Sequence, residues 1–208
     1  MQSWKQLLRA GYRGYPRAAT RPAHRVVVKD PTASLMTVWI ARQFAAQVLV
    51  VMRHPCGFAS SVDALGWQLR TNSLLRQQAL MRDHLEPYTD VLRQVRHDEW
   101  LTRGAIWASI YKVFTRQLET HDDWHLCKYE DLCNDPVNRF STLAQEFGLR
   151  MGQQVHRKLK VLSSTPGTNP GSNRRDSGSM PGIWRQRMSP GQIDAVMGVV
   201  GDFGLDYY

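Results

Sequence analysis

Two basic residues follow short apolar runs, and a hydroxyl residue stands at a fixed interval after the second. Lys29 follows residues 26–28, Arg53 follows residues 48–52, and Ser61 comes eight positions after Arg53. Open α/β sheets bind ligands beyond the carboxyl ends of their strands. An arginine donates to phosphate bidentately, and a hydroxyl at the start of the following helix adds a donor. This arrangement suits one phosphate group; the alternative is an arginine paired with an acidic neighbour and a serine on a helix surface.

The elements expected to position these residues alternate between strand and helix. Apolar β-branched runs predict strands at 25–30, 47–52 and 124–128. Helices are expected from Thr32 or Ser34 to 44, at 58–69, 73–85, 87–96 and 100–119, from Asp135 to Gly148, and from Ser189 to 200. The nearly continuous apolar character of 47–52 is typical of a strand covered on both faces. The predicted fold class is therefore α/β, a parallel sheet flanked by helices.

The composition divides the chain into a short N-terminal segment and one larger domain. Residues 1–24 are expected to form a short helix and a connector, and residues 25–208 a single domain. Within it, Ser, Gly, Asn and Pro dominate residues 163–183, which predicts a long loop. Such loops are either functional lids or disordered.

The composition of the chain indicates which kinds of ligand and partner to expect. The net charge is +9, and 21 of the 27 basic residues are arginine, which favours a phosphorylated ligand unless it reflects only the composition of the source genome. The basic residues are scattered and no nucleic-acid motif is present, so nucleic acid is not expected. Three cysteines show no metal-ligand spacing and do not suggest a disulfide framework, which favours a reducing cytoplasm. No apolar run is long enough to span a membrane, and no membrane partner is expected.

Four stretches, in order, resemble sulfotransferases that use 3′-phosphoadenosine 5′-phosphosulfate (PAPS), of the bacterial and Golgi-type branch. VLVVMRHPCGFASS (48–61) resembles the family's 3′-phosphate-binding motif, and RVVVKDP (25–31) resembles the strand before it. WHLCKYEDLCNDPVNRFSTLAQEFGL (124–149) and RRDSGSMPGIWRQRMSPGQIDAV (174–196) resemble the family's later strand–helix block and its closing loop and helix. The resemblance covers residues 25–208 and implies a P-loop-nucleotide-hydrolase-like sulfotransferase fold.

The resemblance implies five cofactor-binding residues. Arg53 and Ser61 would hold the 3′-phosphate of PAPS, and Tyr129 would lie near the adenine. Arg174 and Arg175 would fold over the nucleotide. The alternatives are that Tyr129 belongs to a polar strand end and that Arg174 and Arg175 are only charges on a disordered loop.

The resemblance also implies two catalytic residues and no metal. Lys29 would touch the transferring sulfuryl group or the bridging oxygen, and Ser164 matches a serine before the family's loop. Lys29 is otherwise a solvated lysine at a strand end. Negative charge builds on the bridging oxygen during sulfuryl transfer, so cations and hydroxyls aimed at it lower the barrier.

One part of the family pattern has no counterpart here. The family has an N-terminal strand, a Gly/Ser/Thr-rich loop and a helix that cradle the 5′-phosphosulfate, and residues 1–24 do not match it. No general base is identifiable either. We therefore expect an N-terminally incomplete domain, weak or inactive by itself, with a complementing N-terminal segment as a possible partner.

The expected function is transfer of a sulfuryl group from PAPS to a hydroxyl or amine acceptor. The acceptor is a saccharide, a peptide or a small alcohol, and the sequence does not select among them. The alternative is a non-catalytic module that binds adenosine 3′-phosphate or another polyanion. A kinase-like P-loop enzyme is disfavoured because no G-x-x-x-x-G-K-[ST] motif occurs.

Overall fold

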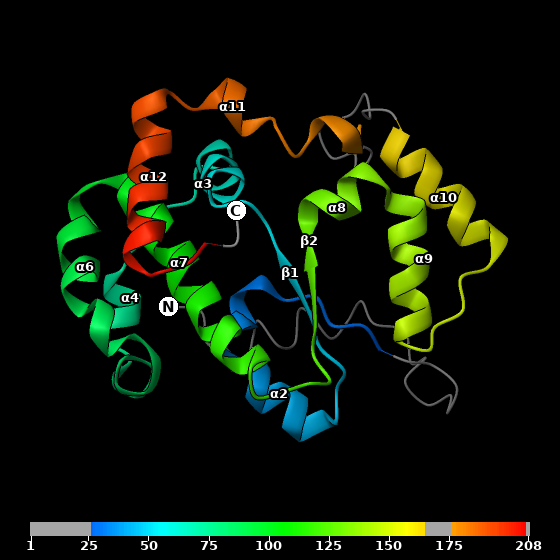
Figure 1. Cartoon of the computed structure of the whole chain (residues 1–208), viewed down its shortest axis with the longest axis horizontal. Helices are drawn as coiled ribbons and strands as arrows, with labels where there is room; N and C mark the ends of the chain where they lie inside the picture. Colours follow the sequence, from blue (N-terminus) through cyan, green and yellow to red (C-terminus); the bar gives the residue numbers. More distant parts are fainter. Residues whose placement is uncertain (1–25, 165–175, 207–208) are drawn as a thin grey trace, which may run out of the picture. The chain divides into compact units, whose positions relative to one another are not determined.

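The computed structural model describes residues 26–164 and 176–206 (Figure 1). The chain divides into two compact units, Met1–Ser34 and Leu35–Tyr208. Every strand and α-helix among the described residues belongs to the second unit. No helix in ranges 26–164 and 176–206 is long and apolar enough to cross a lipid bilayer.

The strand expected at 25–30 is wrong. Residues 26–30 form no regular structure, and the Val27 side chain is 79% exposed. A strand needs a neighbour to accept and donate its backbone hydrogen bonds, and no strand among residues 26–164 and 176–206 pairs with this run. The 3₁₀ helix η2 (Pro31–Met36) follows it, and helix α2 (Thr37–Phe44) begins without a side-chain cap, not at Thr32 or Ser34.

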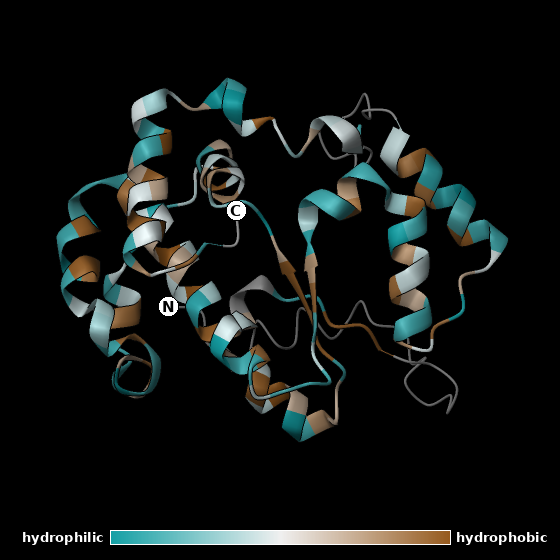
Figure 2. Ribbon diagram, in the orientation of Figure 1, coloured by the Kyte–Doolittle hydropathy of each residue, from teal (hydrophilic) through white to brown (hydrophobic). Residues whose placement is uncertain are grey.

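Two strands form a parallel sheet. They are β1 (Leu49–Met52) and β2 (His125–Lys128), paired with Val50 opposite Leu126. Both expected strands at 47–52 and 124–128 are therefore confirmed, and the chain is a helix-rich member of the α/β class. Figure 2 shows the apolar residues of the two strands side by side.

Only one face of β1 is well covered, so the expectation of burial on both faces is wrong. Val50 and Met52 are buried, whereas the intervening Val51 is 39% exposed. The long helix α7 (Glu99–Leu118) supplies the cover: its Phe114 packs with Val50 and Trp124. Because strand side chains alternate between faces, one covering helix buries every second residue.

The crossover between the strands is more broken than its sequence predicts. It contains α3 (Pro55–Ala64), α4 (Asn72–Leu75), α5 (Gln78–Leu80), the π-helix η3 (Met81–Leu85), the 3₁₀ helix η4 (Glu86–Tyr88), α6 (Thr89–Gln94), the 3₁₀ helix η5 (Val95–His97) and α7. The expected helix 58–69 begins and ends earlier, as α3. It ends because Gly66 takes a left-handed φ of 65°, which lets its N–H and that of Trp67 bond back to the last turn.

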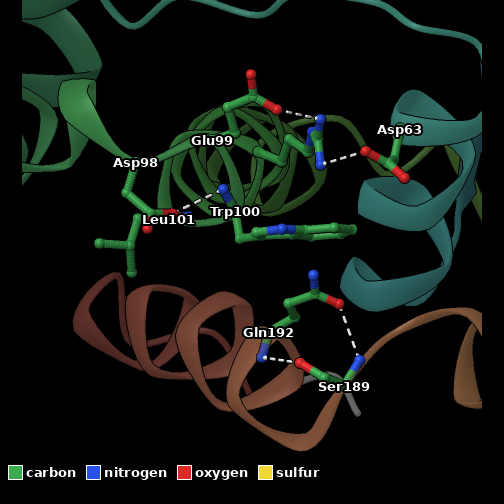
Figure 3. Close-up of polar contacts among 8 residues, drawn as sticks. Asp63, Asp98, Glu99, Trp100, Leu101, Ser189 and Gln192 are labelled. Carbon is green, nitrogen blue, oxygen red and sulfur yellow. Dashed lines mark hydrogen bonds and ion pairs between the residues drawn. The ribbon is translucent and has the colours of Figure 1, made fainter.

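The C-terminal half consists of helices. They are α8 (Tyr129–Asn134), α9 (Pro136–Glu146), α10 (Gln153–Ser164), the 3₁₀ helix η6 (Ser177–Ser179), α11 (Trp184–Arg187) and α12 (Pro190–Asp202). Asp135 caps α9 through its side chain, and Ser189 and Gln192 form a capping box on α12 (Figure 3). The sequence did not predict α10. Its last two residues, Ser163 and Ser164, and the whole of η6 lie within the expected loop 163–183, and α11 begins directly after it.

Helices α3, α7 and α12 pack against one another. The contact of α7 with α12 is close at Gly104, where an added Cβ would lie 3.0 Å from the Val196 carbonyl oxygen. Glycine lets two helix backbones approach to a separation that a larger residue prevents. This trio holds the start of α3 beside the carboxyl end of β1 (Figure 1).

Candidate anion-binding site

The turn from β1 into α3 is held by hydrogen bonds from two other helices. The Trp107 Nε1–H donates to the Arg53 carbonyl oxygen at 2.8 Å, and the Tyr111 hydroxyl donates to the Val51 carbonyl oxygen at 2.8 Å. The His54 backbone N–H donates to Glu130 Oε1, on α8, at 3.0 Å. The backbone on both sides of Arg53 is thus fixed, which fixes where its side chain starts.

Arg53 and Tyr129 come together at the carboxyl ends of the two strands. Arg53 directly follows β1, and Tyr129 directly follows β2. The Arg53 guanidinium carbon lies 4.7 Å from the centre of the Tyr129 ring, a cation–π contact. Within ranges 26–164 and 176–206, no carboxylate forms an ion pair with Arg53. The guanidinium therefore keeps its charge available for an anionic ligand.

Tyr129 is a neutral ring at neutral pH. Burial, together with a hydrogen bond to the Cys133 thiol, raises the pKa of Tyr129 to about 12. A neutral phenol presents a π-face both to the guanidinium and to an aromatic ligand. The site therefore pairs one cation with one aromatic surface.

Gly57 makes room for the Arg53 side chain. A Cβ at Gly57 would lie 3.1 Å from Arg53 Nε and 3.6 Å from Trp184 Cδ1. Ser61 stands one helical turn beyond Gly57 on the same side of α3, because residues four apart share a helix face. Ser61 is the seventh residue of α3, so its expected place near the first turn is wrong.

The N-terminus of α3 offers fewer free donors than a helix start usually does. Pro55 has no N–H, the Cys56 N–H donates to His54 Nδ1 at 3.1 Å, and the Phe58 N–H donates to the His54 carbonyl. The Gly57 N–H has no acceptor in the described part of the chain. An anion beside Arg53 thus has one backbone donor close to the guanidinium.

His54 is a neutral cap and not a base. Its ring stacks on Trp184 with centroids 4.5 Å apart, and burial is the main reason that its pKa falls to about 4; nearby Arg185 lowers it further and Glu130 opposes the shift. Because Nδ1 accepts from Cys56, the ring proton is on Nε2. That nitrogen has no lone pair to take a proton from an acceptor.

The histidine should make folding stability depend on pH. Below pH 6.5 the unfolded chain protonates His54 while the folded chain does not, so stability falls as the pH drops from 6.5 to about 4. The pKa difference between the folded and unfolded chain corresponds to a loss of about 3 kcal/mol in the free energy of unfolding. Because the ring is partly exposed, the expected loss is about 1–2 kcal/mol. Urea denaturation at several pH values measures it. His54→Asn keeps a capping oxygen and should flatten the curve in that window; equal slopes in both proteins would rule out His54 as the cause.

The other predicted site residues form no described contact with Arg53 or Tyr129. Lys29 is exposed and lies in the first unit, in the segment that forms no strand. Ser164 ends α10 and lines an open depression of about 440 Å³ with Ser177. Arg174 and Arg175 lie outside the described residues.

Several residues that build the site were not singled out from sequence. Glu130, Trp107 and Gly57 hold or accommodate Arg53, and Arg185 lies close enough to His54 and Cys56 to lower the pKa of each. Glu130 directly follows Tyr129, so its position just after the second strand could have marked it as a candidate site residue. The contacts of Trp107 and Gly57 with Arg53 depend on tertiary packing and left no local signal.

Burial makes the Cys56 thiol unreactive. It raises the pKa of Cys56 to about 11, so this thiol stays protonated at neutral pH and is a poor nucleophile. No group of three or more potential metal ligands occurs in ranges 26–164 and 176–206. The chemistry that the arrangement itself supports is anion binding beside an aromatic ring.

Comparison with known proteins found no matching family model, no matching curated protein and no matching solved structure.

Proposed function

We propose that this protein binds an adenine nucleotide carrying a 3′-phosphate, in the manner of PAPS-dependent sulfotransferases. The observation that carries the proposal is the Arg53 guanidinium, free of carboxylates among the described residues, resting on Tyr129 at the carboxyl ends of two parallel strands. A phosphate needs a cation and a base needs an aromatic surface, and the two residues supply both. Open α/β sheets bind nucleotides at this edge.

Each residue has a role in holding the 3′-phosphate. Arg53 donates two parallel hydrogen bonds to its oxygens, and the Gly57 N–H adds a third donor. Ser61 donates its hydroxyl from the next turn of α3. The missing Cβ at Gly57 leaves the space in which Arg53 lies, so the residues present fit a phosphate group.

The proposed reaction is sulfuryl transfer from PAPS to a hydroxyl or amine acceptor. In that reaction the bond from sulfur to the 5′-phosphate oxygen breaks and a bond from sulfur to the acceptor atom forms, while a base takes the acceptor's proton. Lys29 is proposed to stabilise charge on the departing oxygen, and Ser164 to donate a hydrogen bond near it. The proposed architecture is the P-loop-like sulfotransferase fold.

A non-catalytic binding module is the second candidate. It is favoured by His54, the histidine beside Arg53, whose lone pair is already used to cap α3. In this version the 3′-phosphate and adenine contacts are the same and no transfer follows.

Calorimetric titration with adenosine 3′,5′-bisphosphate tests both candidates. Adenosine 5′-monophosphate, which lacks the 3′-phosphate, is the matched ligand and should bind at least tenfold more weakly, since a charge-assisted contact contributes about 1.5–3 kcal/mol. Equal affinities would refute the 3′-phosphate site. Radiolabelled PAPS offered with saccharide, peptide and small alcohol acceptors then separates the candidates: label transfer supports the enzyme, and binding without transfer supports the module.

Replacing Gly57 with alanine should weaken binding of adenosine 3′,5′-bisphosphate by about tenfold, because the new methyl group moves the Arg53 side chain. The measurement is calorimetry on parent and variant. Gly191→Ala is the control, since no atom lies within 4 Å of its added Cβ. A Gly57→Ala protein that binds as tightly as the control would show that the position of Arg53 is not limiting.

A further inference from the structure

A polar pocket lies at the opposite end of α3 from Arg53. Its volume is about 470 Å³, within the range of small-molecule sites. Its wall comes from the segment after α3 and from the region where η5 meets α7. The lining residues are Trp67, Gln68, Leu69, Arg70, Thr71, Asn72, Arg96, His97, Glu99 and Arg103.

The pocket is separate from the anion site at Arg53. Helix α3 begins at Pro55, beside Arg53, and ends at Ala64, just before the pocket. Ten residues of α-helix are about 15 Å long. A small ligand in the pocket therefore does not touch the β1–α3 turn.

Arg103 lines the pocket and has a structural role there. It is only 5% exposed and pairs with Asp63 at 3.0 Å and Glu99 at 2.8 Å, which lie on different helices (Figure 3). Its guanidinium also lies 4.4 Å from the centre of the Trp100 ring. Two carboxylates compensate its charge, so Arg103 fixes the wall and does not attract a ligand.

Two other arginines carry uncompensated charge into the pocket. Arg70 and Arg96 are exposed, and no carboxylate of the described residues pairs with either. Arg96 Nε donates to His97 Nε2 at 2.9 Å, which orients the guanidinium and leaves its other N–H groups for a ligand. The pocket therefore favours an anion with room for two contacts.

The rest of the wall combines a flat aromatic surface with amides. Trp67 is 55% exposed, and the glycine turn at Gly66 fixes the backbone that presents it. Gln68 and Asn72 are exposed, and each amide both donates and accepts hydrogen bonds. An indole stacks on the C–H face of a sugar ring, and amides pair with its hydroxyl groups.

We propose that this pocket binds an acidic saccharide, a sugar ring that carries a carboxylate or sulfate group. Trp67 stacks on the ring, Arg70 and Arg96 bind the anionic group, and Gln68 and Asn72 bind hydroxyls. An acidic peptide fits less well, because Leu69 is the single aliphatic residue of the wall and peptide side chains need apolar pockets or a strand edge. The inference does not rest on the proposed nucleotide function.

The test is calorimetric titration of the full chain with a sulfated, uronic-acid-containing tetrasaccharide. Trp67→Ala and Arg96→Ala should each reduce the affinity about tenfold, as expected for one stacking surface or one charge-assisted contact. Trp39→Ala is the matched control for the aromatic change, because Trp39 is 56% exposed, and Arg157→Ala on α10 is the control for charge. Circular dichroism confirms that each variant folds.

The controls should bind as the parent does, and a neutral tetrasaccharide of the same length should bind at least tenfold more weakly. Arg53→Ala should leave saccharide affinity unchanged, which separates this inference from the nucleotide proposal. No binding by the parent, an equal loss in Arg157→Ala and Arg96→Ala, or equal affinity for a poly-glutamate peptide would each overturn the proposal.

Discussion

Replacing Arg53 with alanine is expected to lower the affinity for adenosine 3′,5′-bisphosphate by about a hundredfold. The guanidinium can donate two charge-assisted hydrogen bonds to one phosphate, and losing both removes about 3 kcal/mol of binding free energy. The effect should be large because no carboxylate of the described residues competes for this side chain. Calorimetry at fixed salt measures it.

Arg53→Lys and Arg157→Ala are the controls for that result. Lysine keeps the charge but loses the planar fork, so an intermediate loss of about tenfold is expected. Arg157→Ala removes the same charge from α10 and should bind as the parent does. An Arg53→Ala protein with unchanged affinity and an unchanged melting temperature would remove Arg53 from the site.

Replacing Gly104 with alanine is expected to lower the free energy of unfolding by a net amount of about 1 kcal/mol. The added Cβ would lie 3.0 Å from the Val196 carbonyl oxygen and 3.3 Å from the Val196 Cα. Both atoms belong to the backbone of α12, so relief of the clash requires the whole helix to shift. Overpacking of this kind typically costs about 1–3 kcal/mol, more than the gain in helix propensity of about 1 kcal/mol.

Gly198→Ala is the matched control for the change at Gly104. Gly198 is exposed in the middle of α12, and nothing lies within 4 Å of its added Cβ. Alanine there should stabilise the protein by up to about 1 kcal/mol. Chemical denaturation of the two variants should shift in opposite directions; a stabilised Gly104→Ala protein would contradict the close packing of α7 on α12.

The elements that the sequence predicted well have a strong local signal. The predicted strands at 47–52 and 124–128 and the helix at 100–119 agree with β1, β2 and α7 to within about two residues. Asp135 and Ser189 cap their helices as expected, because a capping side chain bonds within its own turn. These features depend only on neighbours in the chain.

Most of the wrong predictions concern elements whose structure depends on distant residues. The three valines at 26–28 have the composition of a strand, but no strand in the described part of the chain pairs with them. Helix α10 is the exception: its signal was local, because Val155, Leu159 and Leu162 recur at helical spacing, and it was overlooked. The crossover between the strands was predicted as long helices, but Gly66 and the packing against α7 divide it into short ones.

The sequence by itself determined the identity of the candidate site: a basic residue after one strand, a tyrosine after another, and the helix that begins between them. Only the tertiary structure decided how they are held. The parallel pairing of β1 with β2 brings Arg53 over Tyr129, and Trp107, Tyr111 and Glu130 fix the turn through side chains more than 50 positions away along the chain. Local sequence patterns predict strands and helix caps because these depend on residues that are near one another in the chain. A site depends on contacts that exist only once the helices have packed.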